Sequence, residues 1–282
     1  MYEFAFLDET LDINTTQSYH LSIQVSLNGF SFSILDTVRN KYIALKNYPF
    51  DKQKGVPEDQ LKAIFKKDEF LSREYKSSSY LFITDKSTLV PSPLFNKEKT
   101  REYLQFNQPL EENDKIFYNI IKNAGSYTVY SIPVNICEIL DKQFPEIKSY
   151  HQSVPFIEQI LLKNQPGGFE YSAFIHVTHG IFDIAVSQSK KLKLYNQFRY
   201  RNENDFIYFV LNIFEQLKLN PEKTLLLLSG ELTKTSKYFE SVKKYIKSIK
   251  FEKRDSQFTY SYTFNQIPEH TFIPLLNLYS CG

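Results

Sequence analysis

The side chains with the most obvious capacity for chemistry are five histidines and two cysteines, and only one pair of them lies close together in sequence. His176 and His179 bracket a short turn, where paired imidazoles could hold a metal ion. Side chains three residues apart on a strand, however, point to opposite faces of the sheet. No cysteine or second carboxylate joins the two histidines nearby. We therefore predict no metal site here.

Two residues have the reactivity that covalent catalysis requires. Ser229 lies in a predicted strand-to-helix turn, as nucleophilic serines of hydrolases do, but it lacks the flanking glycines of a nucleophile elbow. The sequence assigns it no histidine and aspartate partners. Cys137 lies in an apolar helical segment between Ile136 and Ile139, which is typical of a small core residue. We predict no catalytic residue.

The turn at His179 belongs to a pattern that occurs twice, 152 positions apart. Apolar residues alternate, a short turn with a glycine follows, and the alternation resumes, which predicts a β-hairpin. The matched apolar positions are Leu21, Ile23, Val25, Phe30, Phe32 and Ile34 in the first copy, and Ala173, Ile175, Val177, Phe182, Ile184 and Val186 in the second. A repeat this long indicates two related subdomains and not a solenoid. We place them at residues 1–152 and 153–282.

The elements around the two hairpins are expected in the same order in both halves. The first half should contain strands at 20–26, 30–35, 41–48 and 80–84 and a helix at 58–71. The second should contain strands at 172–178, 181–187, 191–200 and 224–228, and helices at 203–217 and 235–249. A strand at 127–132 and helices at 134–144 and 154–163 are expected between them, while the polar stretch from residue 97 is unassigned. Meander strands, a crossover helix and a further strand predict an α/β fold with a mixed sheet in each half.

The bulk properties exclude several classes of protein. The 34 basic and 32 acidic side chains nearly balance, whereas nucleic-acid binding usually needs a concentrated basic face. The longest strongly apolar run, residues 225–228, is too short to span a bilayer, and the acidic N-terminus is unlike a signal peptide. Two cysteines far apart in sequence do not indicate a disulfide framework. We expect a cytoplasmic protein with no membrane segment and no nucleic-acid partner.

Two basic segments have alternative interpretations. Residues 191–201 alternate charged and apolar side chains and could form a basic, aromatic binding strand. An edge strand whose lysines and arginines block pairing with another sheet explains the pattern better. The lysines of the expected helix at 235–249 are likewise better explained as a solvated face.

Both halves have the same order of elements: strand, glycine turn, strand, strand, helix, strand and helix. This duplicated order resembles the superfamily of actin, the heat-shock chaperone ATPases and hexokinase. Over nearly its full length, the chain more closely resembles the bacterial family of unknown function DUF3822. The resemblance rests on the order of elements, the two hairpins and the segment 81–91, Leu-Phe-Ile-Thr-Asp-Lys-Ser-Thr-Leu-Val-Pro. It implies an actin-like ATPase fold made of duplicated ribonuclease-H-like subdomains.

The resemblance also implies a nucleotide site. In active members of the superfamily, the two hairpin turns grip the phosphates of ATP and a later turn with paired glycines packs the adenosine. The corresponding cofactor-binding candidates here are Ser26, Asn28 and Gly29, then Thr178 and Gly180, then Ser229 and Gly230.

These turns are poor in the groups that a nucleotide needs. A polyphosphate with Mg²⁺ requires backbone N–H donors brought close by glycine, and carboxylates to hold the waters of the metal. Neither hairpin turn carries the aspartate of active relatives, and the third turn has one glycine where they have two. Asp183 is the carboxylate nearest the second turn, but alternation places it on the outward face of its strand.

Two functions therefore stay open. The first is a non-catalytic protein that uses the cleft between the halves to bind a partner protein or a ligand. The second is an active ATPase or kinase that binds ATP with Mg²⁺ and takes its carboxylates from Asp183, Asp36 or Glu231. The depleted turns favour the first.

Overall fold

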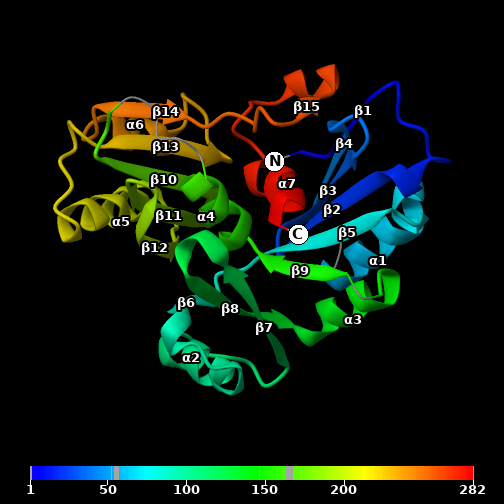
Figure 1. Cartoon of the computed structure of the whole chain (residues 1–282), viewed down its shortest axis with the longest axis horizontal. Coiled ribbons are helices and arrows are strands. Elements are labelled where there is room, and N and C mark those ends of the chain that lie inside the picture. The colour runs from blue at the N-terminus through cyan, green and yellow to red at the C-terminus, as the bar shows by residue number, and fades with distance from the viewer. Residues whose placement is uncertain (1, 52, 54–56, 146, 163–167, 282) are drawn as a thin grey trace.

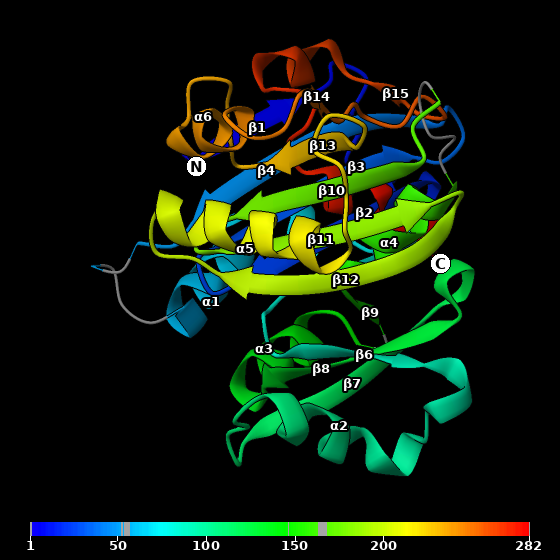
Figure 2. The same cartoon turned by 90° about the vertical axis from the view of Figure 1, so that its left-hand side faces the viewer.

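The computed structural model describes residues 2–51, 53, 57–145, 147–162 and 168–281. Its strands form a seven-stranded, a five-stranded and a three-stranded sheet. Figure 1 shows the two larger sheets side by side, with helices α4 (Ser153–Leu162) and α7 (Ile273–Asn277) between them. The three-stranded sheet lies below both (Figure 2). No helix in the part of the chain that the structure describes is long and apolar enough to cross a membrane.

The first half is built on a mixed sheet in the order β1-β4-β3-β2-β5-β9, with β15 also pairing with β4. Strands β2, β3 and β4 form an antiparallel meander, β5 runs parallel to β2, and β9 runs parallel to β5. The elements are β1 (Phe4–Leu7), β2 (Tyr19–Ser26), β3 (Gly29–Asp36), β4 (Lys41–Pro49), α1 (Pro57–Lys67), β5 (Ser77–Ile83), α3 (Val134–Gln143), β9 (Lys148–His151) and β15 (Thr259–Tyr260). The predicted strands are confirmed. The predicted helix ends early, at Lys67, because the Asp68 carboxylate accepts the Phe70 N–H at 3.0 Å and starts a separate turn.

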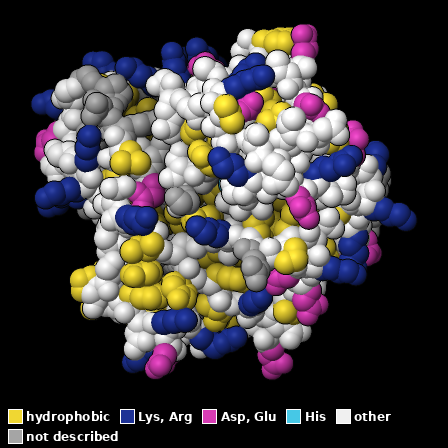
Figure 3. All heavy atoms as spheres, turned by 45° about the vertical axis from the view of Figure 1, so that its right-hand side comes forward, with side chains coloured by type: hydrophobic (Ala, Val, Ile, Leu, Met, Phe, Trp, Pro, Cys, Tyr) yellow, Lys and Arg dark blue, Asp and Glu magenta, His cyan; other side chains and the backbone are white. Residues whose placement is uncertain are grey.

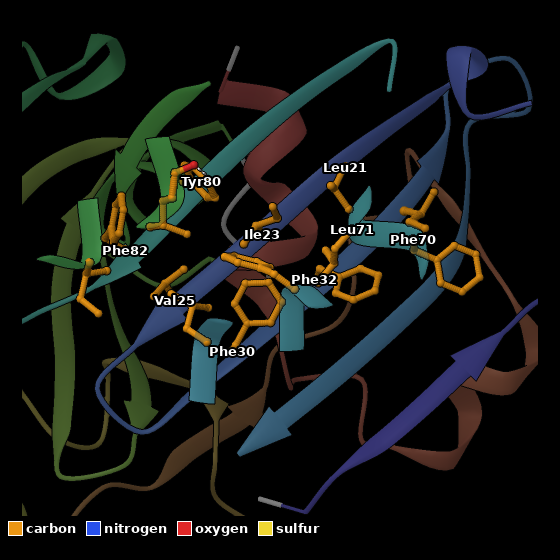
Figure 4. Packing of buried hydrophobic residues seen from close by; sticks show 14 of the residues in the cluster. Leu21, Ile23, Val25, Phe30, Phe32, Phe70, Leu71, Tyr80 and Phe82 are labelled. Atoms are coloured by element: carbon orange, nitrogen blue, oxygen red, sulfur yellow. Dashed lines mark hydrogen bonds between the residues drawn. The ribbon is translucent and has the colours of Figure 1, made fainter. Parts of the chain in front are cut away.

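The alternating apolar residues of the first hairpin form the core of this half. Leu21, Ile23 and Phe32 are fully buried, and Figure 4 shows them pointing to the same side of the sheet. Phe30 packs edge-on against Phe65 of α1, with ring centroids 5.4 Å apart. Burial of such side chains is the main force that fixes the hairpin against its helices.

The second half repeats this plan in a five-stranded sheet of order β12-β11-β10-β13-β14. Its elements are β10 (Tyr171–Thr178), β11 (Ile181–Gln188), β12 (Lys191–Arg199), α5 (Glu203–Gln216), β13 (Leu225–Gly230), α6 (Lys237–Lys243) and β14 (Ser248–Phe251). The helix expected at 235–249 is wrong in its second part. Ile249 and Phe251 alternate on β14, which pairs with β13 and packs against the core of this half.

The duplication is confirmed in the register of the hairpins. Leu21 pairs with Ile34 in the first, and Ala173 pairs with Val186 in the second, 152 positions later. The bulges between β3 and β4 and between β11 and β12 also fall at matching positions. Because the loop after β3 is two residues longer than the loop after β11, β4 and β12 correspond at an offset of 150. Lys41 thus corresponds to Lys191.

Two parts of the chain depart from the simple repeat. The third sheet consists of β6 (Ser87–Pro91), β7 (Asp114–Ile121) and β8 (Ser126–Pro133), with α2 (Thr100–Asn107) beside it. The unassigned stretch supplies β7 and α2, and β8 is the strand predicted at 127–132. Figure 3 shows hydrophobic side chains gathered over the lower part of the molecule, where this sheet lies. The end of the chain crosses back, so that Phe264 and Leu275 pack with Tyr42 in a core of the first half. The division at residue 152 stays a prediction.

Candidate functional site

A cleft of about 480 Å³ lies between the two halves, at the ends of the two hairpins. This volume is in the range typical of small-molecule sites. Five of the seven predicted cofactor-binding residues line it: Ser26, Asn28, Gly29, Thr178 and Gly180. The other two, Ser229 and Gly230, are not among its lining residues, although the neighbouring Glu231 is.

The two hairpin turns have the same internal hydrogen bond. The Ser26 hydroxyl donates to the carbonyl of Gly29 at 3.1 Å, and the Thr178 hydroxyl donates to the carbonyl of Ile181 at 3.2 Å. Gly180 has a φ of +81°, a conformation that favours glycine. Each turn therefore uses its own hydroxyl hydrogen to hold its shape.

Two contacts join the halves across the cleft. The Asn28 side-chain amide donates to the carbonyl of His179 at 3.4 Å, which connects one hairpin turn to the other. Arg199, at the end of β12, forms a two-pronged ion pair with Asp85, just after β5; its Nη2 lies 2.9 Å from Oδ1. Asp85, an acidic residue of the cleft wall, is thus already neutralised by a cation of the same wall.

Ser229 and Gly230 support the sheet from within. The buried Ser229 hydroxyl donates to the carbonyl of Ile175 at 3.3 Å and lies 3.0 Å from Nδ1 of His176. Gly230 has a φ of +91°, and a Cβ there would lie 2.0 Å from the carbonyl oxygen of Val177. Only glycine allows β13 to end this close to β10.

A row of polar side chains that the sequence did not reveal crosses the second sheet. Ser229, His176 and Asp183 are register partners on β13, β10 and β11. Their types are those of a hydrolase triad, but they are 0%, 4% and 1% exposed. Burial lowers the pKa of His176 to about 3, which keeps the ring neutral. A parallel strand pairing brought Ser229 to His176, and no local pattern encodes that register.

We expected Asp183 to point outward on its strand, but its side chain is not exposed to solvent. Its face of the sheet is covered by the segment that begins α4, and its carboxylate accepts hydrogen bonds from Gln152 and Gln197, each at 3.1 Å, and from Tyr195. Burial raises the pKa of Asp183 to about 6, and these hydrogen bonds act against the rise. This carboxylate is not among the residues that line the cleft, and its donors lie within the protein.

The two other carboxylates proposed for a nucleotide site are in different places. Asp36 ends β3 opposite Tyr19, at the other end of the hairpin from the turn, and accepts the N–H groups of Val38 and Arg39. Glu231 lines the cleft and is exposed.

The cleft therefore offers one carboxylate without an ion-pair partner among the described residues, Glu231. No group of three or more histidine, cysteine, aspartate or glutamate side chains within the described ranges is placed to hold a metal ion. Phosphates bound with Mg²⁺ require several oxygen ligands and a positive or N–H-rich surface. The residues that line the cleft do not fit Mg²⁺-ATP.

Comparison with known proteins supports the fold and the family. The model of the family "Protein of unknown function (DUF3822)" matches residues 8–249. A crystal structure from Bacteroides thetaiotaomicron, of a protein with actin-like ATPase fold and unknown function, is 26% identical with a TM-score of 0.83. The match covers 97% of this chain and 100% of that one. A chain of the PilM-PilN type IV pilus biogenesis complex is 9% identical with a TM-score of 0.58, over 94% of this chain and 99% of that chain.

No curated protein matches the chain. The family match spans most of the sequence, and the fold, the register of the repeat and the structural neighbours agree with it. The protein belongs to the DUF3822 family of unknown function and has an actin-like ATPase fold.

Proposed function

We propose that this protein is a non-catalytic binding protein that uses the cleft between its halves to hold a ligand or a segment of a partner protein. The observation that carries the proposal is the state of Asp183. This carboxylate lies near the second hairpin turn, yet it is 1% exposed and accepts hydrogen bonds from three side chains of the protein. It is not available to hold the waters of a magnesium ion.

The rest of the cleft supports the same function. Its wall carries the side-chain amides of Gln24, Asn28 and Asn47 and several hydroxyl groups, while its one arginine is paired with Asp85. Among the described residues, the Gln24 amide has no hydrogen-bond partner, so it can donate to and accept from an occupant. Such a wall suits an uncharged polar ligand or a peptide main chain better than a polyphosphate.

The proposal includes a cytoplasmic location. Cys137 and Cys281 are both free thiols, and unpaired cysteines suit a reducing compartment.

A thermal-shift assay with and without millimolar Mg²⁺-ATP tests the proposal. A ligand at 100 times its dissociation constant stabilises a protein by about 2.7 kcal/mol. For a chain of this size that corresponds to a rise of roughly 4–5 °C in melting temperature. We expect no rise with Mg²⁺-ATP, and phosphate release no faster than in buffer alone.

The alternative, an active Mg²⁺-ATP-binding ATPase or kinase, predicts the opposite result. It would need Glu231, the cleft carboxylate that has no ion-pair partner among the described residues. A shift of several degrees that disappears in Glu231→Gln but persists in Glu222→Gln would overturn the proposal. Glu222 is exposed and does not line the cleft, so its variant makes the same change of charge elsewhere.

A further inference from the structure

Among the described residues, strand β12 is an edge strand, whereas the corresponding strand in the other half of the molecule has a neighbouring strand on each side. Strand β4, its counterpart in the repeat, is flanked by β3 on one side and by β1 on the other, and β15 pairs with its first residues, Lys41 and Tyr42. In the described part of the chain, β12 pairs with β11 alone. Figure 2 shows β12 along the outer edge of the second sheet. The duplication therefore marks a place where one more antiparallel strand fits.

The hydrogen bonds of β4 show which groups such a strand uses. Phe4 and Phe6 of β1 pair with Asn47 and Leu45, and the Asp8 N–H donates to the carbonyl of Ile43 at 2.8 Å. By the offset of 150, these three β4 positions correspond to Gln197, Tyr195 and Lys193 on β12.

The same positions on β12 have main-chain groups that face outward. The Tyr200 N–H donates to the carbonyl of Gly180 at 3.0 Å, and antiparallel pairing alternates, so residues 193, 195, 197 and 199 are directed away from β11. The N–H of Gln197 donates to the side-chain oxygen of its neighbour Asn196 at 2.8 Å, which is a local substitute for a strand partner. An incoming strand would find donors and acceptors at the spacing that β1 uses on β4.

The charges around β12 indicate which kind of strand fits. At the start of β4, the Lys41 ammonium pairs with the carboxylate of Asp8, the residue that follows β1, at 2.7 Å. Its counterpart Lys191 is exposed and has no acidic partner among the described residues. From residue 184 to residue 202 the chain has no acidic residue and five basic ones: Lys190, Lys191, Lys193, Arg199 and Arg201.

Lysines on an edge strand deter pairing with a second basic strand, including another copy of β12. The same lysines attract an acidic one. The half-buried side chains of Leu192, Leu194 and Phe198 along β12 would lose more of their exposed surface beneath an added strand.

We propose that β12 binds an extended segment of a partner protein as an added antiparallel strand. The segment resembles β1 in chemistry: about four residues of β-forming, partly apolar sequence, followed by an aspartate or glutamate that pairs with Lys191. The main chain provides affinity through ladder hydrogen bonds, and the carboxylate fixes the register. Of the β12 positions that face outward, Arg199 also lines the cleft, whereas Lys193, Tyr195 and Gln197 do not, and neither does Lys191. The added strand therefore lies mainly outside the cleft.

A fluorescein-labelled peptide with the sequence of residues 3–9, which contains β1 and Asp8, is a direct probe. We expect saturable binding by fluorescence anisotropy, weakened about tenfold or more by Lys191→Glu, because that change replaces attraction by repulsion. Lys190→Glu makes the same change of charge one residue away, in the turn before β12, and should change the affinity little. A peptide with lysine in place of its aspartate should bind Lys191→Glu better than the original peptide does.

Two further measurements locate the peptide. Amide exchange followed by NMR should slow at Tyr195 and Gln197 when the peptide binds, and a peptide N-methylated at alternate residues should bind at least tenfold more weakly. Equal binding of the N-methylated peptide, unchanged exchange on β12, or equal effects of the two lysine variants would overturn the proposal. So would self-association through β12, seen as a concentration-dependent mass that Lys191→Glu alters.

Discussion

Replacing Asp183 by asparagine should stabilise the protein at neutral pH and have little effect near pH 4. The side chains have the same shape, and the asparagine oxygen can accept from Tyr195 and Gln197 as Oδ1 does. The asparagine nitrogen then faces the amide nitrogen of Gln152, whose oxygen is held by the Thr84 N–H at 2.9 Å, so this one hydrogen bond is lost. The variant removes a buried charge and keeps the hydrogen bonds from Tyr195 and Gln197.

The magnitude follows from the raised pKa of Asp183, from 3.8 to about 6. Between these values the native state binds more protons than the unfolded state, so the stability from this group is complete below pH 4 and is lost as the pH rises through 6. A shift of about 2 units corresponds to about 3 kcal/mol. Above pH 7, Asp183→Asn should therefore melt up to about 5 °C higher than the wild type.

Melting curves of both proteins at intervals between pH 4 and pH 8 measure this difference. The control is Asp59→Asn, which makes the same chemical change at a side chain that is 70% exposed, so it removes no buried charge. An Asp183→Asn difference that is constant across this range would refute the reasoning. So would a difference that becomes more negative as the pH rises, because it would mean that the buried carboxylate is stabilising when charged.

Two further predictions concern packing and acid stability. Gly230→Ala should destabilise the protein by about 3 kcal/mol or more, because φ is positive there and the new Cβ would collide with the carbonyl of Val177. Gly125 also has a positive φ but has open space around it, so Gly125→Ala should cost about 1–2 kcal/mol. Urea denaturation measures the free energy of unfolding of both variants. If Gly230→Ala is as mild as Gly125→Ala, β13 does not approach β10 as described. His151 is buried against the carbonyl of Thr84 and its pKa is lowered to about 4, so it favours the unfolded state as the pH falls from 6.5 to 4. His151→Gln should therefore lose less stability than the wild type over that range, and equal losses would contradict the assignment.

The hairpins could be predicted from sequence because period-two alternation and a glycine turn are local signals. Leu21 and Ala173, matched by the repeat, pair across each turn with Ile34 and Val186, which the repeat also matches. In the third sheet β8 was predicted, at 127–132, but β7 could not be, since it mixes apolar with charged residues and depends on pairing with β8 for its identity. The end of the helix expected at 235–249 failed for a similar reason: Ile249 suits both a helix face and a buried strand, and contact with β13 decides between them.

The candidate site was predictable in part. The repeat located the two hairpin turns, and Thr178 and Ser26 do share a cleft. The burial of Asp183 was not predictable, because alternation assigns a residue to a face of the sheet but does not say what covers that face. The cover is supplied by Gln152 and the start of α4, from the segment that joins the two halves.

Isothermal titration of the protein with Mg²⁺-ATP tests the central claim most directly, since the claim is that the fold is present without the groups that bind nucleotide. We predict no saturable heat of binding up to millimolar nucleotide. A one-site isotherm with a dissociation constant of about 0.1 mM or tighter, abolished by Glu231→Gln, would contradict it.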